Sequence, residues 1–189
     1  MRHPDLKIHP ATPGRWAHVE ALFGKRGACG GCWCQSWRKK AKDFHADTGE
    51  KNRRSLRKII ERGGAPGLLA YLDGKPIGWV AVAPRGVYVR LLDSKVLRPL
   101  DEKPVWSVSC LFILRPWRRK GVSVKLLKAA AEFVKRKGGR IIEGYPVVPY
   151  AEKVPDAFAW TGLLRCFDKA GFKIAGRWSD SRPIVRKYL

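Results

Sequence analysis

The sequence predicts one domain of mixed α/β class, and three local patterns support this. The clearest is an apolar run at 105–114, typical of a strand, which a basic turn joins directly to a helix pattern. A hairpin is indicated where two apolar runs, 68–72 and 77–83, flank an Asp-Gly dipeptide at 73–74. A last helix pattern and two strand patterns complete the chain. At 189 residues the chain has room for one well-packed core and is short for two, so we assign residues 1–189 to a single domain.

The region before the hairpin reads as a short strand and two helices. Residues 6–9 alternate in polarity as a half-buried strand does, and Pro13 opens a helix. A glycine-rich break follows at 24–31, and the run from Cys32 to Trp37 comes after it. Thr48 precedes the second helix, whose narrow apolar face ends at the glycine pair 63–64.

After the hairpin, residues 88–103 read as irregular, and the strand, turn and helix of the central pattern follow. Residues 140–144 form another short strand, parallel to the strand at 105–114 if the helix between them crosses over in the usual right-handed way. A proline-bearing loop then leads to a helix. The face of this helix comprises Phe158, Leu164, Phe167 and Ala170. Final strands are expected at 172–178 and 183–188.

The composition excludes several classes of protein. A hydrophobic content of 45% argues against a disordered chain. No apolar run approaches the roughly 20 residues that cross a bilayer, and the first residues lack an apolar signal core. Five cysteines, three of them crowded together, do not form the framework of a secreted disulfide protein. We therefore expect a cytoplasmic protein with no membrane partner.

The charge is strongly unbalanced. Lysine and arginine number 39 against 16 aspartates and glutamates, which gives a formal net charge of +23. Such a field attracts polyanions whether or not binding one is the function. The excess charge fits an anionic or nucleic-acid-associated partner, and it equally fits a solvated surface.

The basic turn has the features of an anion site. It consists of Arg118, Arg119, Lys120, Gly121, Val122 and Ser123. The first N–H groups of a helix lack partners inside the helix, and the aligned peptide dipoles place positive charge there. Gly121 lets the backbone approach a ligand closely, and a pyrophosphate suits such a turn. The spacing matches neither a P-loop nor a dinucleotide fingerprint.

The pattern Arg118-x-x-Gly121-x-Ser123 instead resembles the Arg/Gln-x-x-Gly-x-Gly/Ala signature of the GNAT superfamily of acetyl-CoA-dependent N-acyltransferases. The run from Phe167 to Phe172 is similar to the end of that superfamily's late helix. The resemblance covers roughly residues 5–188. It implies an α+β fold with a mixed, mostly antiparallel central sheet flanked by helices, in which a splayed parallel strand pair binds acetyl-CoA.

This resemblance also implies a chemistry. Acetyl-CoA would be the co-substrate, with its pantetheine arm pairing with the backbone of Leu111 and Ile113. A backbone N–H there would polarise the thioester carbonyl as the oxyanion develops. The reaction would be direct attack by an amine, which must first lose its proton because an alkylammonium has a pKa of about 10.4. A general base or a water chain is therefore needed.

For proton transfer we favour Glu143, which stands at the end of the strand at 140–144. The alternative is a glutamate held in a salt bridge at the end of the sheet. The superfamily's usual tyrosine proton donor is replaced by Phe167, so Tyr145 or Tyr150 would take its place, or no donor is needed. A water chain ordered by Tyr145 or Ser109 is a further path.

Three cysteines lie at close spacing at the end of the glycine-rich break and just after it: Cys29, Cys32 and Cys34. Zinc bound by these thiolates with His18 or His45, a redox pair and an acetyl-cysteine relay are all conceivable. Structural zinc normally uses two well-spaced pairs, so we favour a packing role and expect no metal. This segment, with Glu143 to Pro146, resembles a subgroup of GNAT proteins, and Trp33 and Trp37 are our candidates for walls of the acceptor pocket.

Two classes of function remain open. The leading interpretation is an N-acetyltransferase acting on an amine that the sequence does not identify, from small amines to lysine, protein N-termini and aminoacylated RNA. The competing one is a basic nucleic-acid-binding module on a catalytically inactive GNAT-like fold, with bases stacking at 33–42 and phosphates along a basic helix face. That face comprises Arg53, Arg54, Arg57, Lys58 and Arg62. An acetyltransferase associated with nucleic acid would satisfy both, and the sequence does not indicate an oligomeric state.

Overall fold

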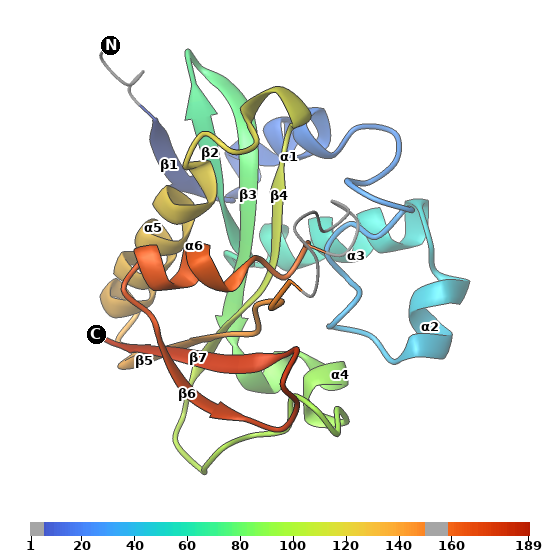
Figure 1. Ribbon diagram of the computed structural model, residues 1–189. Helices are drawn as coiled ribbons and strands as arrows, with labels where there is room; N and C mark the ends of the chain where they lie inside the picture. The colour runs from blue at the N-terminus through green and yellow to red at the C-terminus, as the bar shows by residue number, and fades with distance from the viewer. Residues whose placement is uncertain (1–5, 150–158) are drawn as a thin grey trace.

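The computed structural model describes residues 6–149 and 159–189, and within them seven strands form one sheet with helices on both faces (Figure 1). The strands are β1 (Lys7–Pro10), β2 (Gly67–Leu72), β3 (Lys75–Pro84), β4 (Trp106–Ile113), β5 (Ile141–Gly144), β6 (Lys173–Arg177) and β7 (Pro183–Tyr188). The α-helices are α1 (Trp16–Phe23), α2 (Ala41–Ala46), α3 (Glu50–Glu61), α4 (Val89–Leu92), α5 (Val122–Arg136) and α6 (Leu164–Lys169). Three single-turn 3₁₀ segments are η1 (Pro13–Arg15), η2 (Arg85–Val87) and η3 (Arg115–Trp117).

The sheet is mostly antiparallel, as the sequence predicts. Its order is β1-β2-β3-β4-β5-β7-β6, and every neighbouring pair is antiparallel except β4 with β5. The parallel pair is short, because its register runs only from Trp106 opposite Ile142 to Val108 opposite Gly144. Strand β4 then continues to Ile113 without β5. We call this divergence of β4 from the chain that follows Gly144 the splay.

The hairpin of β2 and β3 forms where the Asp-Gly pattern predicts it. Asp73 has φ +48° and Gly74 has φ +74°, the left-handed conformations that a tight two-residue hairpin turn requires. Side chains along β3 alternate between two cores, with Val80 and Val82 on one face and Trp79 on the other. The hairpin thus lies inside the sheet, between β1 and β4, and β3 is covered on both faces.

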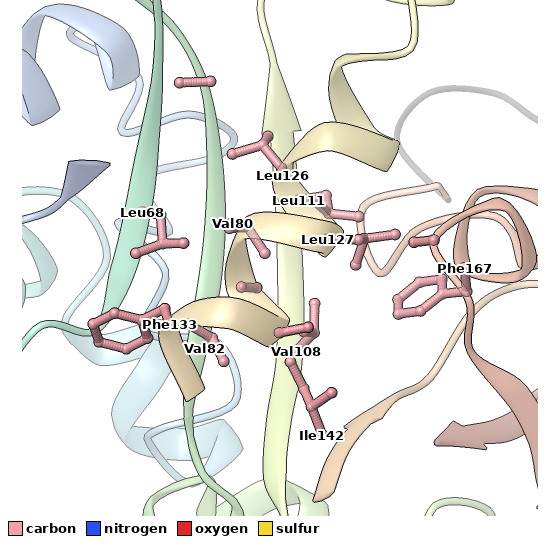
Figure 2. Close-up of a cluster of buried hydrophobic side chains, with 14 of the residues drawn as sticks. Leu68, Val80, Val82, Val108, Leu111, Leu126, Leu127, Phe133, Ile142 and Phe167 are labelled. Atoms are coloured by element: carbon pink, nitrogen blue, oxygen red, sulfur yellow. The ribbon is translucent and has the colours of Figure 1, made fainter. Parts of the chain in front are cut away.

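The first core lies between the sheet and helices α5 and α6 (Figure 2). Helix α5 presents the apolar stripe expected from its spacing, and Leu126, Phe133 and the rest of that stripe are buried. Figure 2 shows α5 crossing β3 and β4, with Leu127 and Phe167 near Leu111. This packing fixes the N-terminus of α5 against the end of β4.

The second core covers the opposite face of the sheet. It contains α1, α3 and the cysteine-rich segment, residues 29–37. Its largest members are Trp16, Phe23, Trp33, Leu56, Ile60 and Trp79. Strand β4 contributes Cys110 and Phe112 to this side, both partly buried. The cysteine-rich segment therefore packs on β4 beside the splay.

Some elements differ from the expectation. Helix α2 was not predicted, and the stretch expected to be irregular contains α4. Phe158, predicted on the last helix, lies outside the described residues, and α6 begins only at Leu164. Within the described parts of the chain, no helix is both long and apolar enough to cross a bilayer.

Candidate functional site

The basic turn combines left-handed backbone with the unpaired N–H groups at the start of α5. Arg119 has φ +61° and Gly121 has φ +76°, so both lie in the left-handed region. For a non-glycine residue such as Arg119 this conformation is strained, and strain of this kind concentrates at binding sites. The backbone N–H of Lys125 donates to the Gly121 carbonyl at 3.2 Å, and this bond closes the first turn of α5. The N–H groups of Val122, Ser123 and Val124 precede that bond and have no partner inside the helix.

Side chains around this turn leave its mouth open. Arg119 and Lys120 are exposed, and Lys120 lies 4.9 Å from the centre of the Trp117 ring. A Cβ atom placed on Gly121 would meet nothing within 4 Å. Left-handed residues, helix N–H groups and cations are features that binding sites for a diphosphate share. The structure thus brings the predicted turn residues together at the C-terminal end of β4.

Two side chains tie the turn to its neighbours. Arg118 donates from Nε to the Ile113 carbonyl at 2.9 Å, which fixes the turn to the end of β4. Ser123 donates from Oγ to Cys166 Sγ at 3.4 Å, which joins the start of α5 to α6. Both predicted residues therefore help to hold the turn in place.

The backbone groups of Leu111 and Ile113, the two β4 positions that the resemblance implies, face away from β3. The backbone N–H of Leu114 donates to the carbonyl of Ile77 in β3 at 3.0 Å, so the backbone groups of Leu114 face β3. Because backbone groups of an antiparallel strand alternate between its two sides, those of Leu111 and Ile113 face away from β3, toward β5 and the splay. Leu111 confirms this, since its N–H donates to the Trp160 carbonyl at 2.7 Å.

A bulge lies where β4 leaves β5. Ala81 is opposite Cys110 and Val82 is opposite Val108, which leaves Ser109 as one extra residue in β4. Bulges bend a strand and often stand next to active sites. Ser109 is buried, and the bend it introduces directs the following backbone into the splay.

Glu143 is fully buried in a network of charges at the paired end of β4 and β5. Arg85 donates to Oε1 at 2.8 Å and Arg186 donates to Oε2 at 2.7 Å. Tyr145 donates to Oε1 at 2.7 Å, and the Ser107 hydroxyl lies 2.6 Å from Tyr145 Oη. The salt-bridged glutamate that the sequence left open is therefore present.

The surroundings also set the protonation of Tyr145. Burial, and then the charge of Glu143, raise the pKa of Tyr145 well above its usual value, so its hydroxyl stays protonated at neutral pH. With both carboxylate oxygens engaged and no exposed surface, Glu143 has no direct path to a ligand in the splay. This geometry favours a structural role, and the assignment of Glu143 and Tyr145 to proton transfer stays a prediction. Tyr150 lies outside the described residues.

The two tryptophans expected to line the acceptor pocket lie in different places. Trp33 is 5% exposed and packs against Trp16 and Phe23 in the second core. Trp37 stacks on Trp160 with ring centres 5.5 Å apart and planes at 29°. Because the Trp160 carbonyl contacts Leu111, this stack places Trp37 near the splay.

The three cysteines do not form one cluster. Cys29 is exposed, whereas Cys34 is buried in the second core together with Cys110. A hydrogen bond with Cys110, and then burial, raise the pKa of Cys34 well above its usual value, and burial raises the pKa of Cys32 to about 11. Both are neutral thiols at physiological pH, and a neutral thiol is a poor nucleophile.

The candidate zinc partners lie apart as well. His18 contacts Tyr71, with Nδ1 and Oη 2.9 Å apart, and His45 lies against Phe44. In residues 6–149 and 159–189, no three His, Cys, Asp or Glu side chains are arranged to hold a metal ion. The described geometry suits the packing role that we favour from the sequence.

Comparisons with known proteins agree with this architecture. No curated protein matches the sequence. Among solved structures, the PaiA N-acetyltransferase from Thermoplasma acidophilum in complex with coenzyme A is 16% identical, with a TM-score of 0.54 over 98% of this chain and 99% of that one. A mosquito arylalkylamine N-acetyltransferase-like 5b protein is 12% identical, with a TM-score of 0.58 over 98% of this chain and 100% of that one.

A third structure, a GNAT family acetyltransferase from Listeria monocytogenes, is 12% identical with a TM-score of 0.58 and covers 97% of this chain and 95% of its own. At these identities the likeness shows the fold alone. The model of the acetyltransferase (GNAT) family matches residues 18–149, well over half of the sequence. The chain belongs to the GNAT acetyltransferase family, whose co-substrate is acetyl-CoA.

Proposed function

We propose that the protein is an N-acetyltransferase that moves the acetyl group of acetyl-CoA to an amine by direct attack. One observation carries the proposal: the backbone of β4 that faces the splay leads, through the turn at 114–120, to the N-terminus of α5 at Gly121. A diphosphate at the turn would thus continue into a pantetheine arm along β4. The activity suits a cytoplasmic location, since all five cysteines are free thiols and such thiols persist in a reducing compartment.

The cofactor would be held mainly by backbone groups. N–H groups of Val122, Ser123 and Val124 would bind the diphosphate, with the exposed cations of Arg119 and Lys120 adding charge. The pantetheine amide would pair with the Ile113 N–H and the Leu111 carbonyl, which face the splay on neighbouring positions. This resembles the addition of a strand to an open sheet edge.

The acetyl group would then lie at the Leu111 N–H, beside the bulge. In the reaction the amine nitrogen forms a bond to the carbonyl carbon, the oxygen gains negative charge, and the C–S bond breaks as the tetrahedral intermediate collapses. An N–H directed at that oxygen stabilises the developing charge. The leaving thiolate needs little help from an acid, since a thiol has a pKa of about 8.5.

The amine must release a proton before or during attack, and two paths are compatible with the geometry. One is a water chain that enters the splay beside Ser109. The other ends at Glu143, and because that carboxylate is buried the proton would have to pass through the hydroxyl of Tyr145. We propose Glu143 as the acceptor only in this relayed form, and a pH profile of its glutamine variant separates the two paths.

The competing nucleic-acid-binding function gains no support from the basic helix α3. Arg53 is ion-paired with Glu20 and with Glu50, and Arg57 is paired with Glu61 at 2.7 Å. Much of the charge on that face is therefore neutralised within the protein. The net charge of +23 instead suits an amine acceptor that carries anionic groups or is associated with nucleic acid.

The function is tested by an acceptor screen that follows release of free thiol from acetyl-CoA. We expect release with at least one amine class among small polyamines, aromatic amines, lysine peptides, protein N-termini and aminoacylated RNA. The acetylated product should be identified by mass spectrometry. Binding of acetyl-CoA with no transfer to any class would argue for a binding protein, and failure to bind acetyl-CoA would contradict the proposal altogether.

A further inference from the structure

A short turn of the chain occupies the splay. Residues 159–162 close a turn in which Gly162 donates to the Ala159 carbonyl at 2.8 Å, with Gly162 at φ +91°. On one side the turn is bonded to β4, through Leu111 N–H and the Trp160 carbonyl at 2.7 Å. On the other side Val147 donates to the Gly162 carbonyl at 2.8 Å. The turn therefore bridges β4 and the chain that follows β5 at Leu111, where the acetyl group of the co-substrate is expected.

The turn fits this place tightly. A Cβ atom on Gly162 would come within 2.7 Å of the Phe167 ring and 2.9 Å of Leu111 Cδ1. On the far side of the same ring, a Cβ atom on Gly144 would come within 2.1 Å of it. Phe167 is fully buried and lies near Leu111 in the view of the core (Figure 2). Packing thus holds the Trp160 carbonyl against the Leu111 N–H, and the bond is short and well placed.

One N–H cannot serve two carbonyls at full strength. In the proposed reaction, Leu111 N–H polarises the thioester oxygen, but in the structure this N–H already donates to the Trp160 carbonyl. The pantetheine amide would instead bind the Ile113 N–H and the Leu111 carbonyl, neither of which is the Leu111 N–H. Free coenzyme A can therefore bind without disturbing Trp160, whereas the acetyl group of acetyl-CoA needs the place that the Trp160 carbonyl holds.

We propose that the Trp160 carbonyl stands in for the thioester oxygen in the free enzyme, and that acetyl-CoA must displace it before transfer. This inference rests on the proposed function. Trp160 is a positioning residue in this account, because it acts through the Leu111 N–H. Its ring stacks on Trp37, which lies under the guanidinium of Arg90 at 5.5 Å. The stack sets how easily the carbonyl leaves, and so it couples the wall near the acceptor site to the polarising donor.

The test compares two ligands that differ only in the acetyl group. We would measure the affinities of coenzyme A and acetyl-CoA by calorimetry for the wild type, Trp160→Ala and Trp37→Ala. Removing either ring loosens the turn, so the affinity for acetyl-CoA relative to coenzyme A should rise by about fivefold, the scale of one hydrogen bond. The control is Trp178→Ala, which removes a tryptophan that is 42% exposed and packs on Arg98. Its ratio should equal that of the wild type.

A second measurement needs no substitution. With ¹³C at the Trp160 carbonyl and ¹⁵N at Leu111, a through-hydrogen-bond NMR coupling between the two nuclei reports their bond. The coupling should be present in the free protein and with coenzyme A, and should vanish with acetyl-CoA. Persistence of the coupling with acetyl-CoA, or an unchanged affinity ratio in both tryptophan variants, would overturn the inference while coenzyme A binding stands. If the wild type binds neither coenzyme A nor acetyl-CoA, the proposed function itself would fail.

Discussion

Glu143 and Arg186 form an ion pair that is nearly closed to water, with Nε and Oε2 2.7 Å apart and the two side chains 0% and 4% exposed. The same arginine also holds Asp101 at 2.7 Å, but that aspartate is 35% exposed. One residue thus connects a buried and a partly solvated carboxylate. Removing one charge from a buried ion pair leaves the other charge buried and uncompensated. Removing a solvated charge does not have this effect, because water compensates the partner.

Glu143→Gln should therefore lower the free energy of unfolding by about 3–5 kcal/mol, since Arg85 and Arg186 lose their shared counter-charge. Urea denaturation followed by tryptophan fluorescence measures this. Asp101→Asn is the matched control, because it removes a carboxylate from the same Arg186 at a solvated position, and we expect a much smaller loss. Equal losses in the two variants would contradict the buried-pair account.

The same Glu143→Gln variant decides whether the carboxylate also accepts the proton of the amine. If it does, turnover should fall by roughly 10²-fold or more and recover in part at high pH, where the amine is already neutral. Affinity for acetyl-CoA should stay near that of the wild type. Turnover that matches the wild type across the pH range would leave the water chain as the proton path.

The partly buried thiol of Cys32 should make the free energy of unfolding fall at alkaline pH. Its pKa in the folded protein is about 11, whereas a cysteine in an unfolded chain has a pKa of about 8.5. The neutral thiol is preferred by the folded state, so the stabilisation is complete below pH 8.5 and is lost as the pH rises toward 11. Cys32→Ala should reduce the fall in unfolding free energy over this window, and the exposed Cys29→Ala should leave it unchanged. An identical slope in all three proteins would refute this.

Purified protein should carry no stoichiometric zinc, because Cys34 packs with Cys110 and the histidines near the segment contact aromatic rings. A chelator should then leave the free energy of unfolding unchanged. Elemental analysis that finds one zinc per chain, lost in Cys32→Ser, would show that the segment is a metal site instead.

The sequence predicts those parts of the site whose residues are neighbours in the chain. The strand, the turn at Arg118 to Ser123 and the start of α5 are continuous in the chain, so a glycine at a helix start and an apolar strand before it suffice to indicate them. The hairpin at Asp73-Gly74 is predictable for the same reason, since left-handed turn residues are specified by their own identity.

The remaining part depends on contacts between distant segments. The bond from Leu111 to Trp160 joins residues 49 positions apart and uses only backbone atoms, so no side-chain pattern marks it. Arg85 and Arg186 stand 58 and 43 positions from Glu143, and among so many cations nothing singles them out. Trp33 could not be told from Trp37 by sequence, because burial is decided by α1 packing over the segment.

The central claim is that acetyl-CoA binds across the turn at Gly121, and calorimetry with the Gly121→Asp variant tests it most directly. The added carboxylate enters open space in the free protein, but it places negative charge where the diphosphate should lie. Gly63→Asp is the matched control, since Gly63 has φ +78° against +76° for Gly121, has the same open surroundings and ends α3 away from the turn. We predict that acetyl-CoA affinity falls at least tenfold, or about 1.4 kcal/mol, in Gly121→Asp and stays unchanged in Gly63→Asp. Equal affinity in wild type and a folded Gly121→Asp variant would contradict the account.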